Sequence, residues 1–369
     1  MFLSRITNKK TGRVFLQIVE SYRKDGRSHQ RTVKALGYLD ELQKEYEDPI
    51  AHFKEVARRM TEEAKAAKAH RILTVSSEQR LVIGEKKTRN IGHLALSALF
   101  HQLQIDAFID DRRRHLDVED DLNHIFRTLV FERALDPAST PGAWNAGGKF
   151  PDKSEYSLEQ VYRSLGIFLS WRDDLIRHLD SQMRKRYGRG NLLISHDLSG
   201  SGTGEPGIRL RLLLDEEGLP VTYELADGRR MIDGPALPIH VADRQDGHAV
   251  RHATKRLKEW FLDIHQVLLR IEEPSGTVDE RIRFHALAGF VALLLIRLLE
   301  KRLDWRYSAE TIRTTLSKAN GTQVGDFYIF DHFDEPLRDI GQDLGIDFSR
   351  QNLTTAELHS LMASVKRSP

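Results

Sequence analysis

The chain contains 369 residues, of which 40% are hydrophobic and 30% are charged, and its formal net charge is +2. This composition is typical of a globular chain with two or three domains and argues against an intrinsically disordered protein. The absence of cysteine excludes disulfides, thiolate nucleophiles and cysteine zinc sites, and it predicts a cytoplasmic protein.

Residues 1–45 are predicted to form a basic module of short strands and tight turns. The pair Asp25-Gly26 is typical of a hairpin turn and separates the strand-like segments "VFLQIVESY" and "QRTVKALGYL". Up to Tyr38 the chain carries nine basic and two acidic residues, a net charge of +7, which leaves −5 for the rest. The basic residues are Arg5, Lys9, Lys10, Arg13, Arg23, Lys24, Arg27, Arg31 and Lys34. This asymmetry favours a polyanion as partner, although a solvated hairpin face explains the charge equally well.

Residues 46–188 are predicted to be helical. Asp48 is a suitable N-cap and Pro49 suits the first turn of the helix that follows. This helix is expected to run into a linker near Ile72 to Lys87. From Asn90 to Tyr187 apolar residues recur at three- and four-residue spacing, which predicts several amphipathic helices.

After residue 191 the apolar pattern changes to that of strands. "NLLISHD" and "LPIHVAD" read as short apolar strands that end at Asp197 and Asp243, and "IRLRLLLDEEGLPVTYEL" between them reads as a hairpin. An acid at the end of an apolar strand is either a turn residue or a functional carboxylate. If the two strands were adjacent and parallel, both carboxylates would meet at one sheet edge. Such oxygen ligands suit Mg²⁺ or Mn²⁺, which activate water for attack on a phosphodiester.

The most apolar segment is "HALAGFVALLLIRLLEKRL". Its uninterrupted apolar run, Ala286 to Ile296, is eleven residues long. A bilayer span needs roughly 20 residues, so we predict a buried helix and no membrane partner. A mixed tail, residues 307–369, follows.

Several of these segments resemble bacterial insertion-sequence transposases of the DDE type, and most closely one branch of the IS-four superfamily. The opening "KKTGRVFLQIVESYRKDGRSHQRTVKALGYLDEL" and "DPIAHFKEV" are similar to the start of these proteins. "NIGHLALSALFHQLQID", "LLLDEEGLPVTYEL" and "DERIRFHALAGFVALLLIRLLEKRL" are similar to their helical region, a hairpin after the first catalytic strand, and their C-terminal helix. The similarity covers most of the chain.

The resemblance implies a mixed α/β fold that is largely helical, with a short N-terminal β module and a small ribonuclease-H-like α/β core. The core would occupy residues 189–306, between the helical region 46–188 and the tail 307–369. It further implies metal-dependent cleavage and transfer of double-stranded DNA at terminal inverted repeats, with the nine basic residues of the N-terminal module in contact with DNA. The oligomeric state is left open, with a homodimer as one option.

The resemblance also implies three catalytic acids. The family's Tyr-Asp-x-Thr strand end matches at Asp197, and its Val-Ala-Asp-(Arg/Lys)-Gly stretch matches "HVADRQDG" at Asp243. The third acid is a Glu on a helix in the family. The best match, "RLKEWFLDIHQVLLR", offers Asp263, with Glu259 as a second candidate. Asp197, Asp243 and Asp263 would together hold two Mg²⁺ (or Mn²⁺) ions.

The chain departs from the family between its hairpin and its second acid. The family fold needs a crossover helix there, and a parallel crossover takes a dozen or more residues. Only "ADGRRMIDGPA" separates Leu225 from Leu237, so the chain reads as a shortened copy. Three functions follow: an active transposase, a catalytically inactive DNA-binding protein derived from one, or a helical interaction protein unrelated to DNA.

Overall fold

The computed structural model describes residues 1–7, 11–24, 27–46, 48–69, 87–136, 149–151, 156–189, 194–197, 208–227, 230–237 and 278–366. For residues 22–24, 27–29, 63–69, 194–197, 208–209, 227 and 278–279 it describes the backbone alone. The chain divides into two compact units, Met1–Ser77 and Glu78–Pro369. The predicted linker falls almost wholly on residues outside the described ranges. The finer four-part division stays a prediction.

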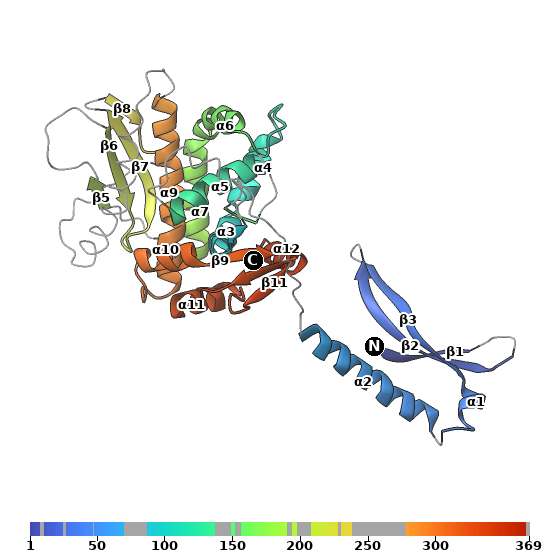
Figure 1. The fold of residues 1–369 in the computed structure, drawn as a ribbon. Helices are drawn as coiled ribbons and strands as arrows, with labels where there is room; N and C mark the ends of the chain where they lie inside the picture. Colours follow the sequence, from blue (N-terminus) through green and yellow to red (C-terminus); the bar gives the residue numbers. More distant parts are fainter. Residues whose placement is uncertain are drawn as a thin grey trace, which may run out of the picture. The chain divides into compact units, whose positions relative to one another are not determined.

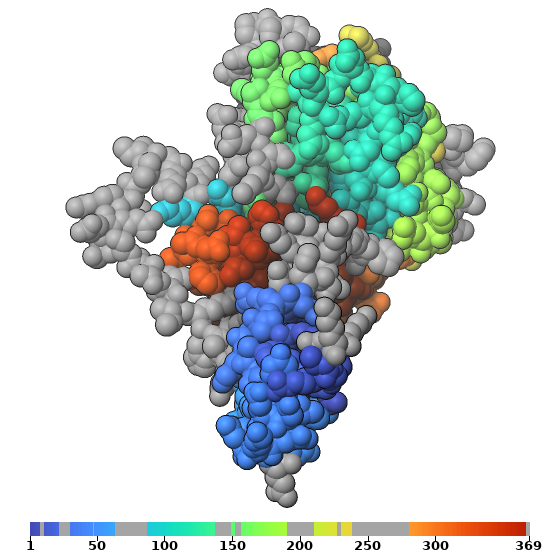
Figure 2. Space-filling model, turned by 90° about the vertical axis from the view of Figure 1, so that its right-hand side faces the viewer, coloured from blue at the N-terminus to red at the C-terminus, as the bar shows by residue number. Residues whose placement is uncertain are grey.

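The N-terminal unit is a three-stranded antiparallel sheet followed by two helices (Figure 1). Its elements are β1 (Phe2–Thr7), β2 (Val14–Lys24), β3 (Arg27–Tyr38), α1 (Leu39–Leu42) and α2 (Pro49–Ala69). As predicted, Asp48 caps α2, since its Oδ1 accepts hydrogen bonds from the backbone N–H groups of Ile50 and Ala51, both at 3.0 Å. Its buried residues include Leu16, Ile18 and Val19 of β2 with Phe53 and Ala57 of α2. Figure 2 shows the described part of this unit as one closely packed body, in blue.

The β2–β3 hairpin is longer than β1. β1 pairs only with Val14–Val19 of β2, whereas β2 and β3 stay paired from Phe15↔Tyr38 to Lys24↔Arg27. The distal part of the hairpin, Glu20–Lys24 with Arg27–Arg31, is therefore a two-stranded ribbon that continues past β1 (Figure 1).

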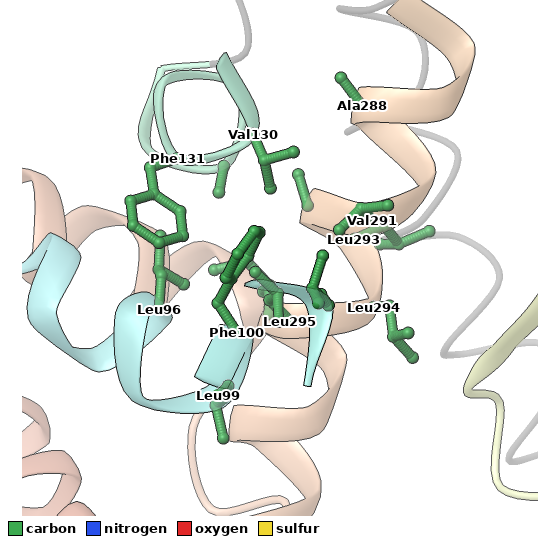
Figure 3. Close-up of a cluster of buried hydrophobic side chains, with 14 of the residues drawn as sticks. Leu96, Leu99, Phe100, Val130, Phe131, Ala288, Val291, Leu293, Leu294 and Leu295 are labelled. Carbon is green, nitrogen blue, oxygen red and sulfur yellow. The ribbon is translucent and has the colours of Figure 1, made fainter. Parts of the chain in front are cut away.

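The larger unit is built around one buried helix, α9 (Val278–Arg302). The helices that precede it are α3 (His93–Gln102), α4 (Ile105–Arg113), α5 (Leu122–Leu135), α6 (Leu158–Ser170) and α7 (Arg172–Tyr187). α9 packs against α3, α5 and α6, and Figure 3 shows Leu96, Phe100 and Phe131 beside its apolar residues. The segment Glu280–Arg302 of α9 is long and apolar enough to cross a membrane. However, 94% of its most apolar stretch is buried inside the unit. The prediction of a buried helix is confirmed.

A four-stranded antiparallel sheet covers another side of α9. Its strands are β5 (Ile194–Asp197), β6 (Ile208–Leu214), β7 (Pro220–Asp227) and β8 (Arg230–Asp233), in the order β5-β6-β7-β8. The predicted hairpin is confirmed as β6 and β7. Tyr223 of β7 lies against Phe290 of α9, with ring centroids 5.5 Å apart.

The C-terminal tail forms a second small sheet with a strand from the start of the unit. The sheet order is β11 (Asn352–Thr354), β10 (Phe327–Phe330), β9 (Asn320–Val324) and β4 (Thr88–Asn90), with α10 (Ala309–Lys318), α11 (Glu335–Leu344) and α12 (Thr355–Val365). The Asn90 side chain donates to the carbonyl oxygen of Leu316 at 2.8 Å. The described chain thus mixes helix and sheet, as predicted, and the ribonuclease-H-like core stays a prediction.

Candidate functional site

The predicted catalytic acids are only partly within the described structure. Asp197 is the last residue of β5, where the structure describes the backbone, and Asp243 and Asp263 lie outside the described residues, as does Glu259. Within the described ranges, no three His, Cys, Asp or Glu side chains lie together as a metal site would need. The three-acid site and its Mg²⁺ or Mn²⁺ ions therefore stay predictions.

Asp197 nevertheless has defined neighbours across the sheet. In the strand register Asp197 lies opposite Arg211 of β6, and Arg211 lies opposite Glu224 of β7. Directly opposite residues share a face, so the three form one charged row. The Arg211 guanidinium pairs with the Glu224 carboxylate at 3.0 Å. Arg211 is thus a cation on the strand next to Asp197, and sequence reasoning missed it.

This row lies on the face of the sheet that points away from α9. Leu210 and Leu212 flank Arg211 in β6 and are buried in the main core, together with Tyr223 of β7. Because successive residues of a strand point to opposite faces, Arg211 points to the other side. Its side chain is half exposed, whereas Leu213, two residues further along the same face, is buried.

The chain between β7 and residue 237 forms a strand, not a helix. β8 pairs antiparallel with β7 from Asp227↔Arg230 to Leu225↔Asp233. This is the segment in which the family would place its crossover helix. The short segment between Leu225 and Leu237 is thus used for a strand.

A buried ion-pair clamp holds the β6–β7 turn against the end of α7. The Arg189 side chain is 1% exposed and donates to Asp215 at 3.1 Å, to Asp180 at 3.1 Å and to the carbonyl oxygen of Pro220 at 2.7 Å. Asp215 also accepts from the backbone N–H of Leu219 at 2.8 Å. Burial raises the pKa of the Asp215 carboxyl in spite of these donors.

Asp215 is an example of an acid that ends an apolar strand and serves as a turn residue. Like Asp197, it follows an apolar strand, so it needed a partner. Its partner is Arg189, 26 residues earlier, and its role is that of a turn residue. The sequence signal was present in the apolar run before Asp215, but it did not identify the partner.

A second buried group joins α7, β7, β8 and α9. Asp233 accepts from Arg283 at 2.8 Å and lies 3.9 Å from Arg172. Arg172 donates to the carbonyl oxygen of Tyr223 at 2.7 Å and stacks on its ring, 4.4 Å from the centroid. Burial raises the pKa of the Tyr223 phenol, which keeps it neutral. These contacts fix the sheet on α9 and carry no evident chemistry of their own.

A third buried polar contact joins α5 to α9. A guanidinium nitrogen of Arg133 lies 2.7 Å from Nδ1 of His285. Burial, with the charges of Arg133 and Arg281, lowers the pKa of His285 to about 3. His285 is therefore neutral near pH 7 and acts as an acceptor for Arg133.

The nine basic residues predicted to contact DNA fall into three groups. Lys9 and Lys10 lie outside the described residues, and Arg23, Lys24 and Arg27 lie on the ribbon strands, where the backbone alone is described. Arg5 and Lys34 are exposed and form no ion pair with another described residue. Arg13 and Arg31 have acidic partners.

Arg13 is held within its own unit. It donates to Asp40 at 2.9 Å and to Glu41 at 2.6 Å, and its guanidinium lies 3.9 Å from the centre of the Tyr38 ring. These hydrogen bonds raise the pKa of Arg13. Arg13 therefore joins the end of β3 and α1 to the start of β2 and is a poor candidate for a free DNA contact.

Comparison with known proteins adds one finding. Residues 3–71 match the family model described as the IS1634 family transposase, N-terminal domain. The match covers nearly all of the N-terminal unit and about a fifth of the chain. Comparisons with curated proteins and with solved structures gave no match. The family model supports the predicted insertion-sequence transposase, while the assignment to the IS-four superfamily and the shortened core stay predictions.

Proposed function

We propose that the protein is a DNA transposase of an insertion sequence, which cleaves and transfers DNA strands at the ends of its element. The observation that carries this proposal is the match of residues 3–71 to the N-terminal domain of IS1634 family transposases. That match coincides with a compact unit whose first 38 residues carry a net charge of +7. A basic module of this kind suits the phosphate backbone of DNA.

The N-terminal unit would bind double-stranded DNA through its phosphates, with the terminal inverted repeats of the element as the target. Binding of this kind releases counterions, so the affinity should fall steeply with salt. Arg5 and Lys34 support this role because they are exposed and form no ion pair with a described residue.

The catalytic step is assigned to Asp197, Asp243 and Asp263 in a ribonuclease-H-like core. Carboxylate oxygens fit Mg²⁺ or Mn²⁺, which would stabilise charge on the phosphodiester and favour a nucleophilic water or 3′-hydroxyl. Asp197 would hold its carboxylate at the end of β5, on the face that it shares with the half-exposed Arg211. Arg211, next to it, would offset its charge before DNA and metal arrive.

β5 and β7 run one way and β6 and β8 the other, with β5 and β8 at opposite edges of the sheet. β8 occupies the segment in which the resembling family has its crossover helix. The proposal therefore requires a core that brings Asp243 to Asp197 without that helix.

The test is strand cleavage by the full chain on duplexes that carry the ends of the DNA element encoding it, in Mg²⁺ and in Mn²⁺. Asp197→Asn is expected to abolish cleavage and leave DNA affinity within about twofold, because a single neutralised acid removes no phosphate contact. The matched control is Asp326→Asn, an exposed acid of the β9–β10 turn, which should cleave like the unchanged chain. Cleavage that survives Asp197→Asn would remove Asp197 from the mechanism.

A second candidate function is DNA binding without catalysis. The arginine beside Asp197 and the aspartate in place of the family's third glutamate both favour it. This candidate predicts the same salt-sensitive binding, with no cleavage of the element ends in either metal.

A further inference from the structure

The distal ribbon of the β2–β3 hairpin stands apart from the rest of the N-terminal sheet. It consists of Glu20–Lys24 and Arg27–Arg31, with Asp25 and Gly26 between the strands. β1 ends its pairing at Val19, so no third strand of the described chain pairs with the ribbon. At the base of the ribbon, Nε of Arg31 donates to Oε2 of Glu20 at 2.9 Å.

The charge of the hairpin is concentrated in this ribbon. The part of β2 that β1 covers, Val14–Val19, has no charged residue. The twelve residues from Glu20 to Arg31 include four basic residues, Arg23, Lys24, Arg27 and Arg31, and two acidic ones. The strand register puts Lys24 directly opposite Arg27, so these two residues share one face near the end of the ribbon.

The ribbon has dimensions that fit one groove of B-form DNA. Paired strands lie about 4.8 Å apart, and five residues of a strand extend about 16 Å. The major groove is about 12 Å wide and 8.5 Å deep and admits a two-stranded ribbon, whereas the minor groove is only about 6 Å wide. A ribbon of this length reaches the floor of the major groove while the sheet stays outside the DNA.

We infer that the ribbon Glu20–Arg31 enters the major groove of duplex DNA, with Lys24 and Arg27 at its leading end. This inference rests on the proposed function, because it names the element through which the N-terminal unit binds DNA. The inference also gives the basic residues different roles: Arg13 stabilises the unit, whereas Lys24 and Arg27 of the ribbon contact DNA.

The test compares two charge-matched double variants of the full chain. Lys24→Gln with Arg27→Gln changes the ribbon, and Lys54→Gln with Arg59→Gln changes two exposed residues of α2 in the same unit. Binding to a mixed-sequence duplex of about 30 base pairs is followed by fluorescence anisotropy over a range of salt concentrations. In the groove Lys24 and Arg27 would lie between the two rows of phosphates and displace counterions, so the loss of each charge should lower the slope of log affinity against log salt by about one. We expect a fall of about two and at least a tenfold loss of affinity for the ribbon variant, with less than a twofold loss for the α2 variant.

A second variant guards against misfolding and tests the groove. Replacing Ser21–Gln30 by Asn-Gly joins Glu20 to Arg31 through a two-residue hairpin turn and keeps every β1–β2 pair. DNA whose cytosines carry bulky glucosyl-hydroxymethyl groups fills the major groove. It should bind the unchanged chain at least tenfold more weakly than plain DNA, whereas the shortened chain should not distinguish the two.

The outcomes separate the inference from the proposed function. Equal losses in the ribbon and α2 variants, or full affinity for the bulky DNA, would overturn the ribbon's role while DNA binding stands. If the unchanged chain binds no duplex even at low salt, the proposed function itself fails.

Discussion

The N-terminal sheet and the β5–β8 sheet differ in how the basic residues around them are paired. In the N-terminal unit, basic residues outnumber acidic ones, and Arg5 and Lys34 remain exposed without an ionic partner among the described residues. Beside the β5–β8 sheet, Arg172 of α7 and Arg189 after it are buried, and each lies near an acid from another segment. A basic residue with a nearby acid therefore holds segments of its unit together, whereas Arg5 and Lys34 stay available for a ligand.

The largest expected effect on stability comes from breaking the ion-pair clamp of Arg189 at the β5–β8 sheet. Arg189→Met leaves Asp215 buried without its cation, while Asp180 keeps only Arg184, and breaking a buried pair costs about 3–5 kcal/mol. Urea unfolding of the full chain measures this loss. Arg186→Met, three residues earlier and exposed, is the control and should change stability by less than about 0.5 kcal/mol. If the two variants unfolded alike, the clamp would not stabilise the sheet.

The next effect concerns pH. His285 has a pKa of about 3 in the folded protein against an ordinary value of 6.5, so the unfolded chain binds one more proton between these values. The stability contributed by neutral His285 is complete above pH 6.5 and is lost as the pH falls toward 3, by up to about 1.4 kcal/mol per pH unit. His285→Gln removes this proton. Its stability, measured in urea from pH 7 to 4, should therefore depend less steeply on pH than that of the unchanged chain.

A smaller effect is expected in the first unit, where the cap of α2 is a local feature. Asp48→Ala removes the acceptor for two backbone N–H groups and should destabilise the N-terminal unit by about 1 kcal/mol. Hydrogen exchange of α2 amides reports the loss locally. Asp48→Ser should restore most of the protection, since serine is also a good N-cap; failure to do so would point to the charge rather than the cap.

The features predicted from the sequence are those encoded by neighbouring residues. The cap at Asp48, the β6–β7 hairpin and the buried α9 are set by turn residues and apolar runs, so a local pattern was enough. β4 was not predicted, because a three-residue strand exists only through its pairing with β9, more than 200 residues further along. The pattern of neighbouring residues does not indicate a strand partner so far along the chain.

In the candidate site, too, only the features encoded by neighbouring residues were predicted from the sequence. Asp197 at the end of β5 follows from the local pattern, whereas its row with Arg211 and Glu224 depends on strand register. A shift of one residue would move Arg211 to the other face, so no reading of "IRLRLLL" alone identifies it as a neighbour of the acid. The meeting of Asp197 with Asp243 and Asp263 is a pairing of distant segments of the same kind, and it stays a prediction.

The smallest effect makes the comparison between the two sheets most direct. Glu20→Gln removes the acid that pairs with Arg31 at the base of the ribbon. The Arg31 side chain is 68% exposed and that of Glu20 is 23% exposed, so stability should change by less than about 1 kcal/mol. DNA affinity should rise by about twofold to fivefold, because an anion is removed from the ribbon that we infer to bind DNA. Glu217→Gln, which removes the partner of Lys301 at the β6–β7 turn of the other sheet, should leave DNA affinity unchanged. Anisotropy titrations of both variants at one salt concentration decide the matter, and an equal rise in both would mean that overall charge, not the ribbon, governs binding.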